Sequence, residues 1–158
     1  MEDSAELEDI YVRTFEFPAG FMAQSQPSMI VADAVHQKLA TGFPVGKRFK
    51  SVPVVRVADS NPAQLGRHHR ADGRWRIYAF ADAAAVRERS FLADWARWLS
   101  ASTESPLLKY TPAGADIDKE FDVKLIAQQD FEGVDLRHVP ATFMARTAPF
   151  GLVDYELV

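Results

Sequence analysis

Cysteine is absent from the 158 residues of this chain. Its absence excludes disulfides, thiolate metal sites, a CxxC redox pair and a cysteine nucleophile. Positive charge is also scarce, because 18 Lys and Arg are outnumbered by 22 Asp and Glu, which gives a net charge of −4. Nucleic-acid binding depends on a basic surface that this balance does not supply. We therefore expect no nucleic-acid partner.

Long apolar runs are missing as well. No stretch approaches the length of about 20 apolar residues that a membrane helix needs. Met1–Asp9 is acidic where a signal peptide would be basic and then apolar. The sequence predicts a cytoplasmic protein without a membrane partner. The rest of the composition, 47% hydrophobic and 25% charged residues, is typical of one globular domain with its own core.

Two β-rich runs, residues 46–57 and 74–81, are expected to organise the chain. In the second run Trp75, Ile77 and Ala79 lie on alternate positions, and its far end is apolar on both faces. This pattern predicts a central strand that is covered on each side. Asn-Pro and Asp-Gly steps between the runs mark turns, so we expect the two runs to pair as a hairpin.

Three further elements are expected downstream. Residues 86–102 predict an amphipathic helix whose apolar stripe comprises Phe91, Trp95, Trp98 and Leu99. Alternation over residues 121–127 predicts another strand. Asp135 is expected to cap a short helix that Pro140 limits.

The first 45 residues carry weaker signals. Tyr11, Phe15 and Phe17 alternate with other residues over 11–17 and predict a short strand that Pro18 ends. Residues 21–45 predict an irregular arm with one helical turn at most.

Gly42–Arg48 ends in Gly-Lys and invites comparison with a phosphate-binding loop. The spacing is one residue short of GxxxxGK[ST], and Arg48 replaces the hydroxyl residue that would hold magnesium. We interpret the segment as a tight turn. GxGxxG does not occur in the sequence, so a dinucleotide-binding βαβ unit has no support.

His68, His69 and Asp72 could suggest a metal site, but neighbouring strand residues point to opposite faces and cannot easily hold one ion. We interpret these histidines as exposed hairpin residues. His36 and His138 follow no ligand spacing.

A catalytic triad could be assembled from Ser90, Asp135 and His138. However, the sequence around them indicates no nucleophile elbow and no oxyanion hole. The three tryptophans, Trp75, Trp95 and Trp98, are expected in a core or an interface. We predict no catalytic, cofactor-binding or metal-ligating residue in this chain.

Several motifs together resemble one family, the flavin-dependent aromatic hydroxylases of the phenol 2-monooxygenase and 3-hydroxybenzoate hydroxylase type. Their carboxy-terminal domain is similar to Gly46-x-Arg48, Pro53–Arg56, Asp59-x-x-Pro62-x-x-Leu65-Gly66 and Asp72–Asp82. The resemblance extends to Phe121–Lys124, Val134–Leu136, Val139-Pro140 and Pro149–Glu156, and upstream to Phe15–Phe17, Pro27–Val31 and His36–Pro44.

The resemblance implies an α/β, thioredoxin-like mixed sheet flanked by helices and without redox cysteines. Residues 1–45 would match the end of the substrate-binding domain and the linker that leaves it, and residues 46–158 the thioredoxin-like domain of phenol hydroxylase type. In the family this domain serves dimerisation and covers the catalytic domains. The flavin motif lies further upstream, so no catalytic or flavin residue is carried over.

Two departures from the family qualify this expectation. Gly20–Ser25 lies where relatives have a turn of different sequence. Relatives also continue beyond Tyr155-Glu156 into a closing hairpin and helix. We therefore expect an incomplete sheet and a marginally stable or aggregation-prone chain.

Three functions remain open from the sequence. The first is a non-catalytic dimerisation or cover domain of a phenol 2-monooxygenase-like enzyme. Its partners would be a second copy or the flavin and substrate domains, with FAD and NADPH bound elsewhere in the parent enzyme. The alternative is a stand-alone thioredoxin-like interaction module without flavin chemistry. A third is a small-ligand-binding domain with an apolar pocket between the Trp95 helix and the sheet.

Overall fold

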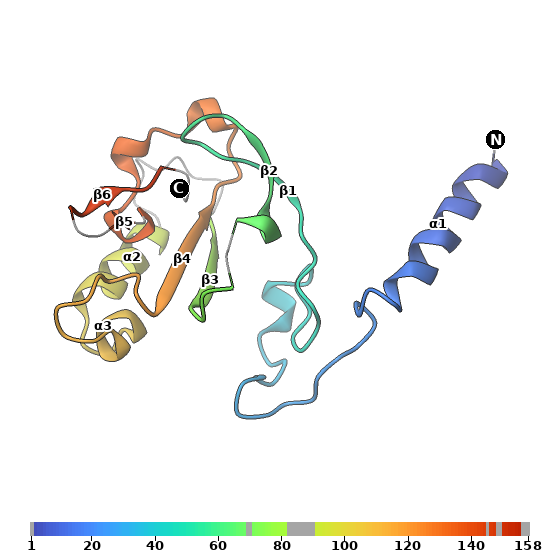
Figure 1. Ribbon diagram of the computed structural model, residues 1–158, viewed down its shortest axis with the longest axis horizontal. Coiled ribbons are helices and arrows are strands. Elements are labelled where there is room, and N and C mark those ends of the chain that lie inside the picture. Colours follow the sequence, from blue (N-terminus) through green and yellow to red (C-terminus); the bar gives the residue numbers. More distant parts are fainter. Residues whose placement is uncertain (1, 69–70, 82–90, 145, 148–149, 156–158) are drawn as a thin grey trace. The chain divides into compact units, whose positions relative to one another are not determined.

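The computed structural model describes residues 2–68, 71–81, 91–144, 146–147 and 150–155 (Figure 1). The fold is mixed α/β, as the sequence predicts. The chain divides into two compact units, Met1–Val52 (unit 1) and Pro53–Val158 (unit 2).

Unit 1 begins with helix α1, Glu2–Glu16 (Figure 1). The prediction of a strand at residues 11–17 is therefore wrong. The same residues also satisfy helical spacing, since the rings of Tyr11 and Phe15 lie 4.3 Å apart between centroids and Arg13 pairs with Asp9 at 2.9 Å. Such i,i+4 contacts stabilise a helix locally. A strand would instead require a neighbouring strand for its backbone groups.

The remainder of unit 1 is irregular, as expected for an arm. Its one described helical turn after α1 is the 3-10 turn η1, Gln37–Leu39. Residues 6–52, whose exposure is described, include no buried side chain. Unit 1 therefore has no hydrophobic core among its described residues.

Unit 2 opens with a small antiparallel hairpin of β1, Pro53–Val55, and β2, Pro62–Gln64. The prediction that the run 46–57 pairs with 74–81 is wrong. The Asp59 carboxylate accepts hydrogen bonds from Arg56 Nε at 2.8 Å and from the Asn61 amide at 3.1 Å. These short-range bonds close a tight turn, so β1 finds its partner a few residues later.

The main sheet of unit 2 pairs β3, Trp75–Phe80, in parallel with β4, Phe121–Ile126 (Figure 1). The predicted strand at 121–127 is confirmed. The prediction that residues 74–81 form a central strand is not confirmed. In the part of the chain that the structure describes, β3 pairs with β4 alone. Phe80 is about half exposed. Parallel pairing over a long connection is not visible in the local sequence pattern.

Two helices pack against the apolar face of this sheet: α2, Phe91–Ala101, and α3, Pro106–Tyr110. The shared core contains Ala79, Ala96, Leu99, Leu107, Val123 and Phe143. Helix α2 lies inside the predicted range 86–102, of which residues 86–90 lie outside the described residues.

The predicted apolar stripe of α2 is partly wrong. Ala96 and Leu99 are each 1% exposed, whereas Phe91 is 91% and Trp98 43% exposed. A small residue allows a helix to approach a sheet closely, so α2 packs along its Ala96–Leu99 line and leaves two aromatic side chains outside.

The rest of unit 2 consists of short turns and a hairpin. The 3-10 turns are η2 (Leu65–Arg67), η3 (Phe131–Gly133), η4 (Leu136–His138) and η5 (Ala141–Phe143). The capping role of Asp135 is confirmed, because its carboxylate accepts the Arg137 amide at 3.0 Å. Strands β5, Arg146–Thr147, and β6, Leu152–Val153, pair antiparallel. None of the described helices has the length and hydrophobicity to cross a membrane.

Candidate functional site

Exposed aromatic side chains gather in two places on unit 2. On α2, Phe91 and Trp98 lie two helical turns apart on one face (the α2 patch). At the start of the sheet, Trp75 is 59% and Tyr110 61% exposed, and both lie beside Phe121 (the sheet-end patch). Trp75 is opposite Phe121 in the β3–β4 register, and the Tyr110 and Phe121 rings are 6.4 Å apart.

Large aromatic residues of this kind dominate the energy of protein interfaces. Each buries roughly 150–250 Å² when it is covered. The two patches therefore give unit 2 surfaces suited to association. The sequence predicted the tryptophans in a core or an interface, but it placed Trp98 on the apolar stripe of α2 rather than outside it.

The opposite face of the β3–β4 sheet carries a charged cluster. Asp122, whose side chain is 4% exposed, lies 3.2 Å from Arg76 Nε and 3.2 Å from Lys124 Nζ. Arg76 Nη2 also lies 2.7 Å from Asp72 Oδ1. Arg74 pairs with Asp72 at 2.9 Å. The cluster joins the turn before β3 to the middle of β4.

The charges of this cluster shift one another's pKa values. Burial raises the pKa of Asp72, but hydrogen bonds from Arg74 and Arg76 outweigh it and hold that pKa well below the ordinary value. Burial raises the pKa of Asp118 above its ordinary value, against the opposing charge of Arg74. Burial likewise raises the pKa of Tyr78. Because its acids and bases pair with one another, the cluster serves to fix the sheet.

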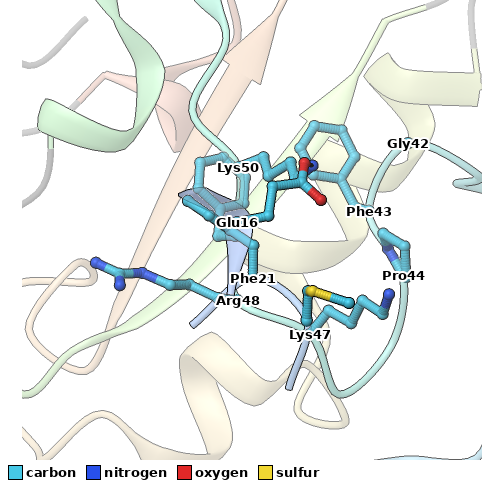
Figure 2. A pocket seen from close by; sticks show the side chains of 10 residues that line it. Glu16, Phe21, Gly42, Phe43, Pro44, Lys47, Arg48 and Lys50 are labelled. Carbon is cyan, nitrogen blue, oxygen red and sulfur yellow. Dashed lines mark hydrogen bonds and ion pairs between the residues drawn. The ribbon is translucent and has the colours of Figure 1, made fainter. Parts of the chain in front are cut away.

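Unit 1 contains a hollow of about 380 Å³ (Figure 2). Gly42–Arg48, the segment compared with a phosphate loop, forms part of its lining together with Phe21, Phe49 and Lys50. The segment is a turn, as expected, and Lys47 forms an isolated antiparallel bridge with Gln24. No sequence pattern indicated the hollow, because the rest of its lining comes from residues far away in the chain.

The histidine prediction is wrong for His68, which is half-buried rather than exposed. Its amide donates to the carbonyl of buried Leu65 at 3.2 Å, so the 3-10 turn η2 carries it inward. Burial lowers the pKa of His68, and the nearby cations Arg56 and Lys124 lower it further. His69 lies outside the described residues.

Among the described residues alone, the other candidate constellations do not form a complete site. The described residues contain no group of three or more metal-ligating side chains. His138 Nδ1 lies 3.4 Å from Asp135 Oδ2, while Ser90 lies outside the described residues. Trp95 packs against the core, with its ring 6.2 Å from that of Phe143.

Comparison with known proteins supplies the family. The sequence model of the phenol hydroxylase C-terminal dimerisation domain matches residues 23–158. A 3-hydroxybenzoate 4-monooxygenase of Comamonas testosteroni is 41% identical over 157 residues, and the match covers 99% of this chain. The FAD-dependent monooxygenase terD of Aspergillus terreus is 29% identical over 155 residues, 97% of this chain. The chain spans 25% of the length of each relative. It belongs to the family of phenol hydroxylase C-terminal dimerisation domains.

Proposed function

We propose that this chain is the non-catalytic dimerisation and cover domain of a phenol 2-monooxygenase-like, FAD-dependent aromatic hydroxylase. The parent enzyme would hydroxylate a phenolic ring with NADPH and oxygen. The observation that carries the proposal is the pair of exposed aromatic patches on unit 2, in a chain of a dimerisation-domain family. The names of two relatives, both monooxygenases, support the parent reaction.

The residues of this chain do not fit FAD. A dinucleotide pyrophosphate is held by a glycine-rich turn between a strand and a helix N-terminus, and the sequence contains no GxGxxG. The hollow of unit 1 is lined by loop residues and by the end of α1 instead. FAD and NADPH would therefore bind other domains of the parent enzyme.

The proposal includes the finer architecture. Helices α2 and α3 lie between strands β3 and β4 in the chain, and the two strands are parallel, the arrangement of a βαβ unit. We assign residues 46–158 to the thioredoxin-like domain and residues 1–45 to the arm that resembles the end of a substrate-binding domain. A cytoplasmic location agrees with a chain without cysteine.

Self-association of the chain tests the proposal. We expect sedimentation at micromolar concentration to detect a dimer, and the double variant Phe91→Ala/Trp98→Ala or the variant Trp75→Ala to weaken it at least about tenfold. Leu39→Ala removes an exposed apolar side chain of unit 1 and is the matched control. A monomer at these concentrations, or a dimer that neither variant weakens, contradicts the proposal.

The identity of the partner requires a second experiment. Purification from the native source should recover flavin-containing hydroxylase domains with this chain. Recovery of a dimer without any flavoprotein would instead support the alternative, a stand-alone interaction module without flavin chemistry.

A further inference from the structure

The hollow of unit 1 has aromatic walls (Figure 2). The rings of Phe43 and Phe49 stack nearly parallel, 5.2 Å apart between centroids and at an interplanar angle of 10°. Phe21, which also lines the hollow, carries two cations over its ring, Arg48 at 5.3 Å and Lys50 at 5.5 Å. A flat apolar ligand would find planar surfaces here.

The rim of the same hollow is positively charged. Lys47, Arg48 and Lys50 line it with a single carboxylate, Glu16, which pairs with Lys50. The hydrogen bond from Lys50 lowers the pKa of Glu16, and the charges of Lys50 and Lys47 lower it further. Three cations and one anion leave two positive charges at the hollow, so it favours an anionic ligand.

The loop that carries these groups is held in place by two sets of hydrogen bonds. The Gln37 side chain accepts the Val45 amide at 2.6 Å and donates to the Ala40 carbonyl at 2.7 Å. At the other end, the Ser25 amide donates to the Gly46 carbonyl at 2.8 Å. A loop fixed before binding loses less conformational freedom when a ligand arrives.

We propose that this hollow binds a small aromatic carboxylate, with its ring against the Phe43–Phe49 wall and its carboxylate toward Lys47. A volume of about 380 Å³ lies at the low end of the range of roughly 300–1,000 Å³ for small-molecule sites, which suits a single ring. Neutral phenols lack the charge, and inorganic phosphate lacks the ring. The site is independent of the patches of unit 2 and goes beyond dimerisation.

Calorimetric titration of the whole chain with benzoate at low salt tests the proposal. We expect saturable binding with a dissociation constant of about 1 mM or lower. Phenol, cyclohexanecarboxylate and phosphate should each bind at least about tenfold more weakly. Phosphate bound as tightly as benzoate would show a simple anion site, and phenol bound as tightly would show a simple apolar site. Either result overturns the proposal.

Variants locate the binding. Lys47→Gln removes one rim charge and Phe43→Leu removes one ring while keeping an apolar wall, and each should weaken benzoate binding about tenfold. Lys38→Gln, at an exposed lysine outside the lining, is the control for the loss of one charge. Equal benzoate affinity in all three variants, or no saturation up to about 10 mM, rules out the site. Sedimentation of the same samples reports separately on dimerisation.

Discussion

Arg76 and Asp122 lie opposite each other in the parallel register of β3 and β4, with Arg76 Nε 3.2 Å from Asp122 Oδ2. Asp122 is almost fully buried, and Lys124 lies at the same distance on its other side. Removing one member of a buried ion pair leaves charge that water cannot reach, which typically costs about 3–5 kcal/mol.

We expect Asp122→Asn to lower the free energy of unfolding by about 3 kcal/mol, the lower end of that range because Arg76 keeps Asp72 as a partner. Urea unfolding should show this loss of stability as a lower midpoint, while the dependence of the unfolding free energy on urea concentration stays unchanged. Asp94→Asn breaks the exposed pair with Arg97 and should cost less than about 1 kcal/mol. Equal effects of the two substitutions would mean that Asp122 is not part of a buried cluster.

Ser105 connects the end of α2 to the start of α3. Its hydroxyl donates to the Leu99 carbonyl at 2.6 Å and accepts the Leu107 amide at 3.2 Å, and the residue is completely buried. Ser105→Ala should destabilise the chain by about 1–2 kcal/mol, since it removes the helix cap and leaves a buried carbonyl without its donor. Thermal unfolding detects this as a lower midpoint.

Ser100→Ala is the matched control for that experiment. Ser100 is exposed, and its hydroxyl donates to the Ala96 and Arg97 carbonyls of its own helical turn, while alanine is the better helix former. We expect no loss of stability. A loss as large as that of Ser105→Ala would argue against a specific role of the cap.

Local signals in the sequence predicted the elements whose contacts are also local. The alternation in β4 and the cap at Asp135 were both correct, because period-two patterning and a carboxylate that accepts an amide two residues away are short-range properties. The resemblance of motifs spread along the chain predicted the family, which the match over residues 23–158 confirms.

Sequence patterns failed where the outcome depended on distant partners. The pairing of β3 with β4 joins segments more than 40 residues apart, and no local pattern encodes it. Residues 11–17 fit both a strand and a helix, and contacts such as Tyr11–Phe15 decided for the helix. The unit 1 hollow combines Glu16 and Phe21 with a loop over 20 residues later, so only the folded chain reveals it.

Gly46 is required by the loop that lines the unit 1 hollow. Its φ is +77°, and a Cβ at this position would lie 2.4 Å from the Ser25 carbonyl oxygen. Gly46→Ala should therefore shift the loop, at a cost of about 1–2 kcal/mol from the left-handed backbone alone. Amide exchange measured by NMR should show the Ser25 amide exchanging at least about fivefold faster, because its bond to Gly46 is strained.

Gly42→Ala provides the comparison, since a Cβ at Gly42 would meet nothing within 4 Å. Exchange at Ser25 should stay as in the original chain. If both substitutions speed exchange equally, the close approach of Gly46 to Ser25 does not control the loop.

His68 should make the stability of unit 2 depend on pH. Burial lowers its pKa below the ordinary value of 6.5, the cations Arg56 and Lys124 lower it further, and Asp59 opposes them. A histidine whose pKa is lower in the folded state than in the unfolded state binds its proton preferentially after unfolding. Its contribution to stability is therefore complete above about pH 6.5 and is lost as the pH falls through that value toward the folded-state pKa.

We expect the urea midpoint of the original chain to fall between pH 7.5 and pH 5.5, and His68→Gln to make that fall smaller, because glutamine does not titrate. His36→Gln removes an exposed histidine of unit 1 and should retain the original fall. The half-buried position of His68 limits the size of the effect, since water screens part of each charge. A His68→Gln chain whose midpoint falls as steeply as the original would assign the pH dependence to other groups. Asp118 is not one of them, because a carboxyl with a raised pKa adds stability as the pH falls.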